Sequence, residues 1–188
     1  MPKYSSEIDY IIDEDAFAKL FNHTNTDSER TWITILWLTG ARPAEALEIK
    51  KKDIVFLEDG RVEFKLATKK LGKEGKFVVR RRHLILKIDP ANRYIKAVKR
   101  HLLRVKDVES NIFFFSRRTG YNIIDRVGFD ALGVNICPYN FRHSRLTLMA
   151  EKGASEGELM RFKGALSTQS VKPYIHARKV EYEVEVDI

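Results

Sequence analysis

The chain has 188 residues, of which 34 are Lys or Arg and 26 are Asp or Glu, so its net charge is +8 and its isoelectric point about 9.5. Because 44% of the residues are hydrophobic, only one is cysteine, and no apolar run approaches ~20 residues, a disordered tail, a disulfide scaffold and a membrane-spanning protein are excluded. We expect one cytoplasmic domain with a polyanionic partner, since the first residues also lack the apolar stretch of a signal peptide.

The positive charge is concentrated in residues 61–106, which hold 16 Lys and Arg against 3 acidic residues, whereas the rest of the chain holds 18 against 23. We interpret this segment as a surface that follows a phosphate backbone, although lysines that only face solvent are the alternative. Asn and Gln are rare, with 8 amides against 60 charged residues, a bias typical of heat-adapted proteins.

Three helices are expected in the first fifty residues. Acidic residues beginning at Asp13 open the first, Thr26 caps the second, and Pro43 occupies the first turn of the third, where its missing N–H costs nothing. Arg42 therefore lies at a helix start, where the helix dipole disfavours a cation and favours an anionic ligand. The expected ranges are 13–22, 26–40 and 43–50.

From Asp53 the hydrophobic period changes to two, which predicts strands. A Glu-Asp-Gly turn separates the first two strands and a Lys/Gly-rich tip separates the next two, so we expect a small antiparallel sheet with a basic hairpin. The expected strands are 54–57, 61–68 and 76–88.

The rest of the chain is expected to be mainly helical, in four further helices that follow a long basic helix and a short buried strand. The basic helix begins at Asp89 and Pro90 and ends near Val105. Residues 178–188 alternate and predict an edge strand that pairs with the sheet or with a neighbouring protomer. The fold class is therefore α+β, mostly helical, in a single domain over 1–188. The remaining expected ranges are 111–115 for the strand and 121–132, 138–152, 155–163 and 167–176 for the helices.

Three segments that are far apart in the sequence look like parts of one site. Residues 39–47, TGARPAEAL, present an Arg at a helix start with an acid three residues later. Residues 67–76, ATKKLGKEGK, form the tip of the basic hairpin. Residues 138–144, PYNFRHS, are followed about thirty residues later by 172–176, KPYIH.

These segments and their order resemble the catalytic domain of the tyrosine recombinase (phage-type integrase) family, over residues 12 to 177. That family carries an Arg in T-G-x-R-x-x-E, a hairpin Lys, an H-x-x-R box and a C-terminal Tyr. The resemblance implies the catalytic residues Arg42, Lys69, Tyr139, Arg142 and Tyr174, with Lys73 as the alternative to Lys69.

Residues near the predicted catalytic residues are assigned supporting roles. Glu45 is interpreted as a partner that orients an Arg, and Arg142 as a residue that could pair with it. His143 and His176 are interpreted as supporting residues. The basic segment predicts a further set of residues that bind DNA, namely Lys70, Lys76, Arg80, Arg81 and Arg82.

Two positions depart from the family pattern. Tyr139 stands where the box usually begins with His, and Ala165 stands where a His or Trp usually follows the glycine. The Tyr-x-x-Arg form is similar to that of archaeal plasmid and virus integrases. A phenol can hydrogen-bond a phosphate oxygen, but with a pKa near 10 it does not shuttle protons at neutral pH as imidazole does.

The resemblance implies an enzyme that cleaves and rejoins double-stranded DNA through a 3′-phosphotyrosyl intermediate, with no metal or cofactor, and that self-associates as a tetramer on DNA. Two guanidiniums would bind the phosphate oxygens and a Lys would protonate the leaving 5′-oxygen. The N-terminal module that completes the family's DNA clamp is expected to be absent. The alternatives are a type IB topoisomerase and a DNA-binding protein with weakened catalysis.

Overall fold

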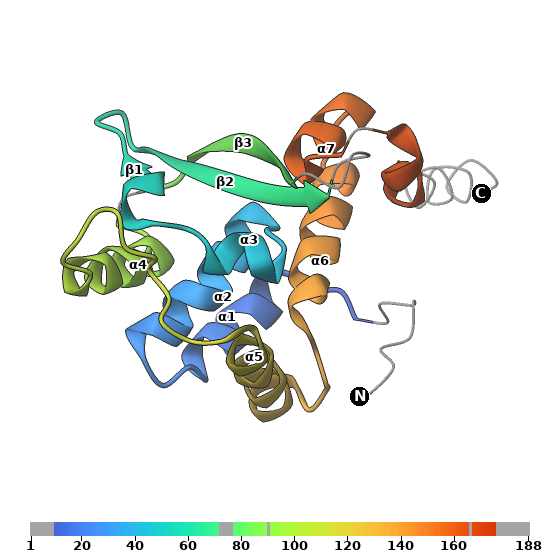
Figure 1. The fold of residues 1–188 in the computed structure, drawn as a ribbon. Helices are drawn as coiled ribbons and strands as arrows, with labels where there is room; N and C mark the ends of the chain where they lie inside the picture. The colour runs from blue at the N-terminus through green and yellow to red at the C-terminus, as the bar shows by residue number, and fades with distance from the viewer. Residues whose placement is uncertain (1–9, 72–76, 90, 166, 176–188) are drawn as a thin grey trace.

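The computed structural model describes residues 10–71, 77–89, 91–165 and 167–175, which form a helical body with a small sheet along one side (Figure 1). The α+β, mostly helical fold class is confirmed. The helices are α1 (Glu14–Asn22), α2 (Asp27–Thr39), α3 (Pro43–Leu47), α4 (Arg93–Arg104), α5 (Arg117–Leu132), α6 (Pro138–Glu151) and α7 (Glu156–Lys163), with 3₁₀ turns η1 (Lys51–Asp53) and η2 (Thr168–Ser170). The strands are β1 (Ile54–Phe56), β2 (Arg61–Leu71) and β3 (Phe77–Lys87).

Helix α2 lies at the centre of the helical body. The Thr26 side chain caps its start by accepting a 3.1 Å hydrogen bond from the Glu29 N–H, and Gly40 ends it in the left-handed conformation with φ of 54°. Trp32 is fully buried, and its indole N–H donates to the Gly120 carbonyl of α5 at 3.1 Å. The helix therefore joins the core to α5 and, at its C-terminal end, leads directly into α3.

The sheet has the order β1-β2-β3, and both pairs are antiparallel. Val62, Phe64 and Leu66 alternate along β2 as buried residues, so one face of the sheet covers the core. Leu66 pairs in register with Arg82, and the Arg82 guanidinium donates to the Phe162 carbonyl of α7. This contact holds the middle of β3 to α7, and Figure 1 shows the β2–β3 pair passing beside that helix.

Several expected boundaries are wrong, and side-chain caps explain most of them. The third helix ends at Leu47 because the Asp53 side chain accepts from the Lys50 N–H at 3.0 Å and starts η1. Helix α4 begins at Arg93, since the Asn92 side chain caps it. Helix α5 begins at Arg117, after its cap Ser116.

Two other expectations also change. The strand expected at 111–115 is wrong: Asn111 forms a single bridge with Lys50, and Ile112 and Phe113 are buried in a connecting segment. The helix expected at 167–176 is instead η2 followed by helical backbone at 172–175. The terminal strand expected at 178–188 lies outside the described residues. None of the described helices is long and apolar enough to cross a membrane.

Candidate active site

The Glu45 carboxylate joins α3 to both long strands. Its Oε1 accepts from the Arg42 guanidinium at 2.6 Å and from the Thr68 hydroxyl at 2.5 Å. Its Oε2 accepts from the Arg82 guanidinium at 3.1 Å and from the Arg42 N–H at 2.9 Å. Only 2% of the Glu45 side chain is exposed. Glu45 therefore orients two arginines, as the sequence predicted for one.

The electrostatic environment keeps this buried carboxyl ionised. Burial alone would raise the pKa of Glu45, but the charge of Arg82 and the hydrogen bonds from Thr68 and Arg42 outweigh it and lower the pKa to about 2. At neutral pH the carboxylate is fully charged and holds its two guanidinium partners in place.

Arg142 extends from α6 toward the end of α2. It donates to the Gly40 carbonyl and to the Lys163 carbonyl, each at 2.6 Å. These partners carry no net charge, so the ion pair with Glu45 that the sequence suggested is not what orients this side chain. Burial first, and then the charges of Arg42 and Arg82, lower the pKa of Arg142 to about 10.

Positive charge is in excess at this point. Within the described part of the chain, Glu45 is the carboxylate that the guanidiniums of Arg42 and Arg82 share, and Arg142 adds a third cation. We name Arg42, Arg82 and Arg142 the arginine cluster. Arg82 and Arg142 are largely buried and Arg42 is partly exposed. Forked cations that outnumber their carboxylate partners suit an anion such as a phosphate.

Tyr174 lies beside the arginine cluster on the helical segment after η2. Its hydroxyl is 3.2 Å from His143 Nδ1, and Lys163 Nζ lies over its ring at 5.1 Å from the centroid. Lys163 also donates to the Ser170 carbonyl, which ties α7 to η2. Burial raises the pKa of Tyr174, and the charge of Arg142 opposes this.

The structure therefore brings Arg42, Arg142, Glu45 and Tyr174 together, but it does not bring Tyr139 into the described contacts of this site. Tyr139 is 39% exposed in the first turn of α6.

The hairpin residues are placed only in part. Lys69 directly follows Thr68, the residue that binds Glu45, and pairs in register with Val79. Its backbone is thus next to the arginine cluster. Lys70 and Arg80 also lie in the paired strands, whereas Lys73 and Lys76 lie outside the described residues.

Arg82 is the clearest correction among the predicted site residues. The sequence predicted it on a DNA-binding surface, but 9% of its side chain is exposed and it belongs to the arginine cluster. Successive strand residues point to opposite faces, so Arg81 and Arg82 could not share one surface. That alternation was the signal available in the sequence.

Lys163 and Thr68 were missed, and His143 was given only a supporting role. One sequence signal could have pointed to Lys163. It directly precedes Gly164 and Ala165, and Ala165 is the position where the resemblance expects a His or Trp.

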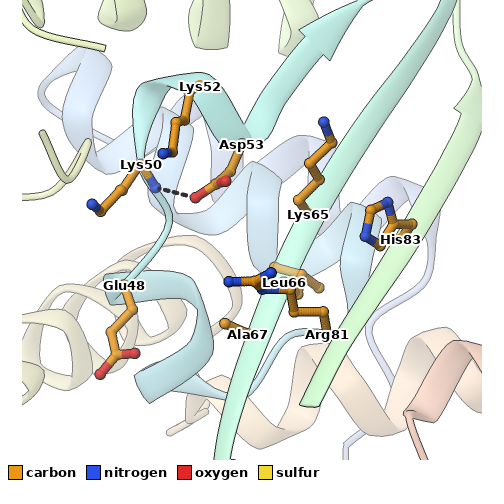
Figure 2. Close-up of a pocket in the computed structure, with 9 residues that line it drawn as sticks. All are labelled: Glu48, Lys50, Lys52, Asp53, Lys65, Leu66, Ala67, Arg81 and His83. Carbon is orange, nitrogen blue, oxygen red and sulfur yellow. Dashed lines mark hydrogen bonds between the residues drawn. The ribbon is translucent and has the colours of Figure 1, made fainter. Parts of the chain in front are cut away.

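A basic groove of about 480 Å³ lies on the outer side of the same strands (Figure 2). Lys65, Arg81 and His83 reach it from β2 and β3, and Lys50 and Lys52 from the loop and η1. Of these, the sequence had predicted only Arg81. Its other lining residues are Glu48, Asp53, Leu66 and Ala67.

Several of these side chains already contact carboxylates. Lys50 and Lys52 contact the Glu109 carboxylate at 3.2 and 2.6 Å, and Lys65 and His83 contact the Glu63 carboxylate at 3.5 and 3.0 Å. Among the described residues, no group of three His, Cys, Asp or Glu side chains could hold a metal ion.

The sequence model of the phage integrase family matches residues 11–181. A search of curated protein sequences found no match.

Solved structures with the same fold include recombinases and an integrase. XerA recombinase aligns with a TM-score of 0.72 and 20% identity over 95% of this chain and 65% of the other. XerH recombinase, in a post-cleavage complex with its palindromic difH substrate, aligns with a TM-score of 0.72 and 22% identity over 97% of this chain and 54% of the other. The Tn1549 transposon integrase with transposon right end DNA aligns with a TM-score of 0.60 and 14% identity over 98% of this chain and 68% of the other. The chain thus spans less than two thirds of the first two proteins.

Proposed function

The chain belongs to the phage integrase family of tyrosine recombinases, and we propose that residues 1–188 form the catalytic domain of a site-specific DNA recombinase. The observation that carries the proposal is the convergence of the arginine cluster with a tyrosine hydroxyl. Arg142 lies close enough to Tyr174 for its charge to act on the phenol. A phosphodiester held by the arginines would therefore meet an oxygen nucleophile.

The chemistry is a transesterification. The Tyr174 oxygen attacks phosphorus, the bond to the 5′-oxygen breaks, and a 3′-phosphotyrosyl link forms that conserves the bond energy for rejoining. Arg42 and Arg142 bind the non-bridging oxygens, where negative charge grows, an effect worth several kcal/mol in a site that excludes water. Lys69, with Lys73 as the alternative, protonates the leaving 5′-oxygen.

Double-stranded DNA is the proposed substrate because cations continue beyond the arginine cluster. The basic groove presents Lys65 and Arg81 on the outer face of the strands whose inner face holds Arg82 and Thr68. A duplex that places one phosphate at the arginine cluster would have neighbouring phosphates within reach of such a surface. Tetrameric self-association on DNA is part of the same proposal and rests on family membership.

The test is capture of the covalent intermediate. Nicked duplexes of randomised sequence lose a short 5′-hydroxyl fragment after cleavage, so the adduct is trapped and migrates slowly on a denaturing gel. The parent protein should form this band and Tyr174→Phe should not. Tyr121→Phe, on α5, is the matched control and should form it at the parent level. A band that persists in Tyr174→Phe, or no band from the parent at any temperature, would contradict the proposal.

A topoisomerase shares this chemistry, so the gel is paired with a relaxation assay on supercoiled DNA. A recombinase should join strands between two duplexes that share a site. Relaxation by the isolated protein, with no exchange between duplexes, would instead favour the topoisomerase.

A further inference from the structure

The contact between His143 and Tyr174 joins two elements that are distant in the sequence. His143 follows Arg142 on α6, and Tyr174 lies on the segment after η2. His143 Nδ1 is 3.2 Å from the Tyr174 hydroxyl oxygen, and the ring centroids are 5.1 Å apart. An imidazole nitrogen therefore touches the atom that attacks phosphorus in the proposed reaction.

The surroundings of His143 favour its neutral form. Burial lowers the pKa of His143, and the positive charge of Lys163 on α7 lowers it further. Among the described residues, two further titratable groups face His143 and its contact: Tyr174, which His143 touches, and Arg142, which precedes His143 on α6 and acts on Tyr174. At pH 7 the ring is neutral, so the nitrogen facing Tyr174 can carry the lone pair that accepts a proton.

Lys163 favours the product of that transfer. Its ammonium lies over the Tyr174 ring, where positive charge stabilises a phenolate more than a phenol. Burial and the positive charges of Arg142 and Arg42 lower the pKa of Lys163, so Lys163 shares the positively charged surroundings of the arginine cluster.

We propose that His143 is the general base of this site, with the Tyr174 hydroxyl proton as its substrate. This inference rests on the proposed function and adds a residue to it. As the Tyr174 oxygen bonds to phosphorus, its proton passes to His143 Nδ1. The bond from phosphorus to the 5′-oxygen breaks, and that oxygen takes a proton from the hairpin lysine. In rejoining, the imidazolium returns the proton to the tyrosine oxygen that leaves.

The assignment answers a question that the sequence raised. Tyr139 and Ala165 stand where the family pattern has His, and His or Trp. Neither side chain takes up a proton at neutral pH as imidazole does. His143 supplies an imidazole from a different position, one turn of α6 beyond Tyr139.

The test compares His143→Gln and His143→Ala with the parent and with His23→Gln, a histidine at the end of α1. Rates of adduct formation on the trapped duplex are measured in single turnover from pH 5 to 9. Both His143 variants should be slower by about 10²-fold or more. The parent rate should rise through a pKa below 6.5 and level off, and the variants should lose this plateau. Added imidazole should accelerate His143→Ala.

Several outcomes overturn the inference. If His143→Gln reacts at the parent rate, His143 is not the general base. If His143→Gln is slow but keeps the parent pH profile, and imidazole does not accelerate His143→Ala, the role of His143 is structural. If the parent forms no adduct, the proposed function fails and the inference with it, which separates the two failures.

A second measurement does not depend on a variant that folds. Nitrogen NMR of the parent at pH 7 should show His143 neutral, with its proton on Nε2. A protonated ring, or a proton on Nδ1, would also overturn the inference.

Discussion

Glu45 sets the charge of the candidate active site. One buried carboxylate accepts hydrogen bonds from Arg42, Arg82 and Thr68, and so fixes α3 against β2 and β3. Removal of this carboxylate would leave both guanidiniums without their charge partner, and the cost falls mainly on Arg82, since 9% of its side chain is exposed and an isolated buried cation is costly. Glu45 is therefore as important for the stability of the fold as for the geometry of the site.

Glu45→Gln should lower the free energy of unfolding by about 3 kcal/mol or more, the cost of breaking a buried ion pair. The amide can still accept from Arg42 or Thr68, but it carries no charge for Arg82. Chemical denaturation at pH 7 measures this loss. Glu109→Gln is the control, because Glu109 binds Lys50 and Lys52 at the surface. Its loss should be much smaller, because exposed ion pairs contribute little to stability, and equal losses for the two variants would refute this role.

The same residue predicts an acid limb of stability. The pKa of Glu45 is lowered to about 2 in the folded state from an ordinary value of 4.5, so its contribution is complete above pH 4.5. That contribution, about 3 kcal/mol, should disappear as the pH falls from about 5 to 2. Unfolding curves of the parent and Glu45→Gln should converge over this range. A constant difference down to pH 2 would contradict the assignment.

Sequence patterns found the residues whose chemistry lies in a local motif. Arg42 and Glu45 are three residues apart at a helix start, a spacing that lets the two side chains meet, and the sequence predicted both residues for the site without pairing them with each other. The contact of His143 with Tyr174 spans 31 residues and depends on how α7 and η2 return the chain to α6. No local spacing encodes that path, and the sequence therefore undervalued His143.

At the level of elements, the turn from α2 into α3 positions both predicted arginines. Gly40 has a φ of 54°, and its carbonyl accepts from Arg142. The next residues place Arg42 at the start of α3. A β-carbon at Gly40 would also lie 2.9 Å from the Phe162 ring of α7. Backbone conformation and packing thus both require glycine here.

Gly40→Ala should therefore be more destabilising than Gly133→Ala. Gly133 ends α5 with a similar φ of 69°, but a β-carbon there meets nothing within 4 Å. The control should lose about 1 kcal/mol from backbone strain alone. Gly40→Ala should lose about 1 kcal/mol more and form the DNA adduct more slowly, because the Arg142 acceptor moves. Thermal unfolding of both variants measures the difference. Equal losses of stability would show that the Phe162 ring moves aside without cost.

The elements themselves were largely predictable, but their ends were not. Capping and periodicity located α1, α2 and the three strands within a few residues. The expected strand at 111–115 is instead a buried connection, because an apolar run bounded by turns reads alike whether its partner is a strand or the core. Burial of Ile112 and Phe113 satisfies the pattern without a sheet.

For the whole molecule, the fold separates two sets of cations. The arginine cluster lies on the inner side of the β2–β3 pair, and the basic groove on the outer side. The sequence predicted the basic segment but assigned both sets of residues to one surface, because Arg81 and Arg82 are adjacent in the chain. The heat-adapted origin that the composition suggested, and the archaeal origin that the Tyr-x-x-Arg form suggested, stay predictions.

The basic groove predicts the salt dependence of DNA binding. Each phosphate contact that is lost reduces the slope of log affinity against log salt by about 0.9. Lys65→Gln combined with Arg81→Gln should lower the slope by about 1 to 2 and weaken binding alike for all sequences. Lys19→Gln combined with Lys152→Gln removes the same charge from α1 and the C-terminal end of α6. That control should leave the slope unchanged, and equal slopes for both pairs would argue against the groove.

The central claim is that Tyr174 bonds to a 3′-phosphate of DNA with the help of the arginine cluster. Its most direct test is mass spectrometry of the trapped adduct after digestion of protein and DNA. We predict one modified peptide, with a nucleotide joined through its 3′-phosphate to Tyr174, and a released strand that ends in a 5′-hydroxyl. Attachment to another residue, or through a 5′-phosphate, would contradict the account.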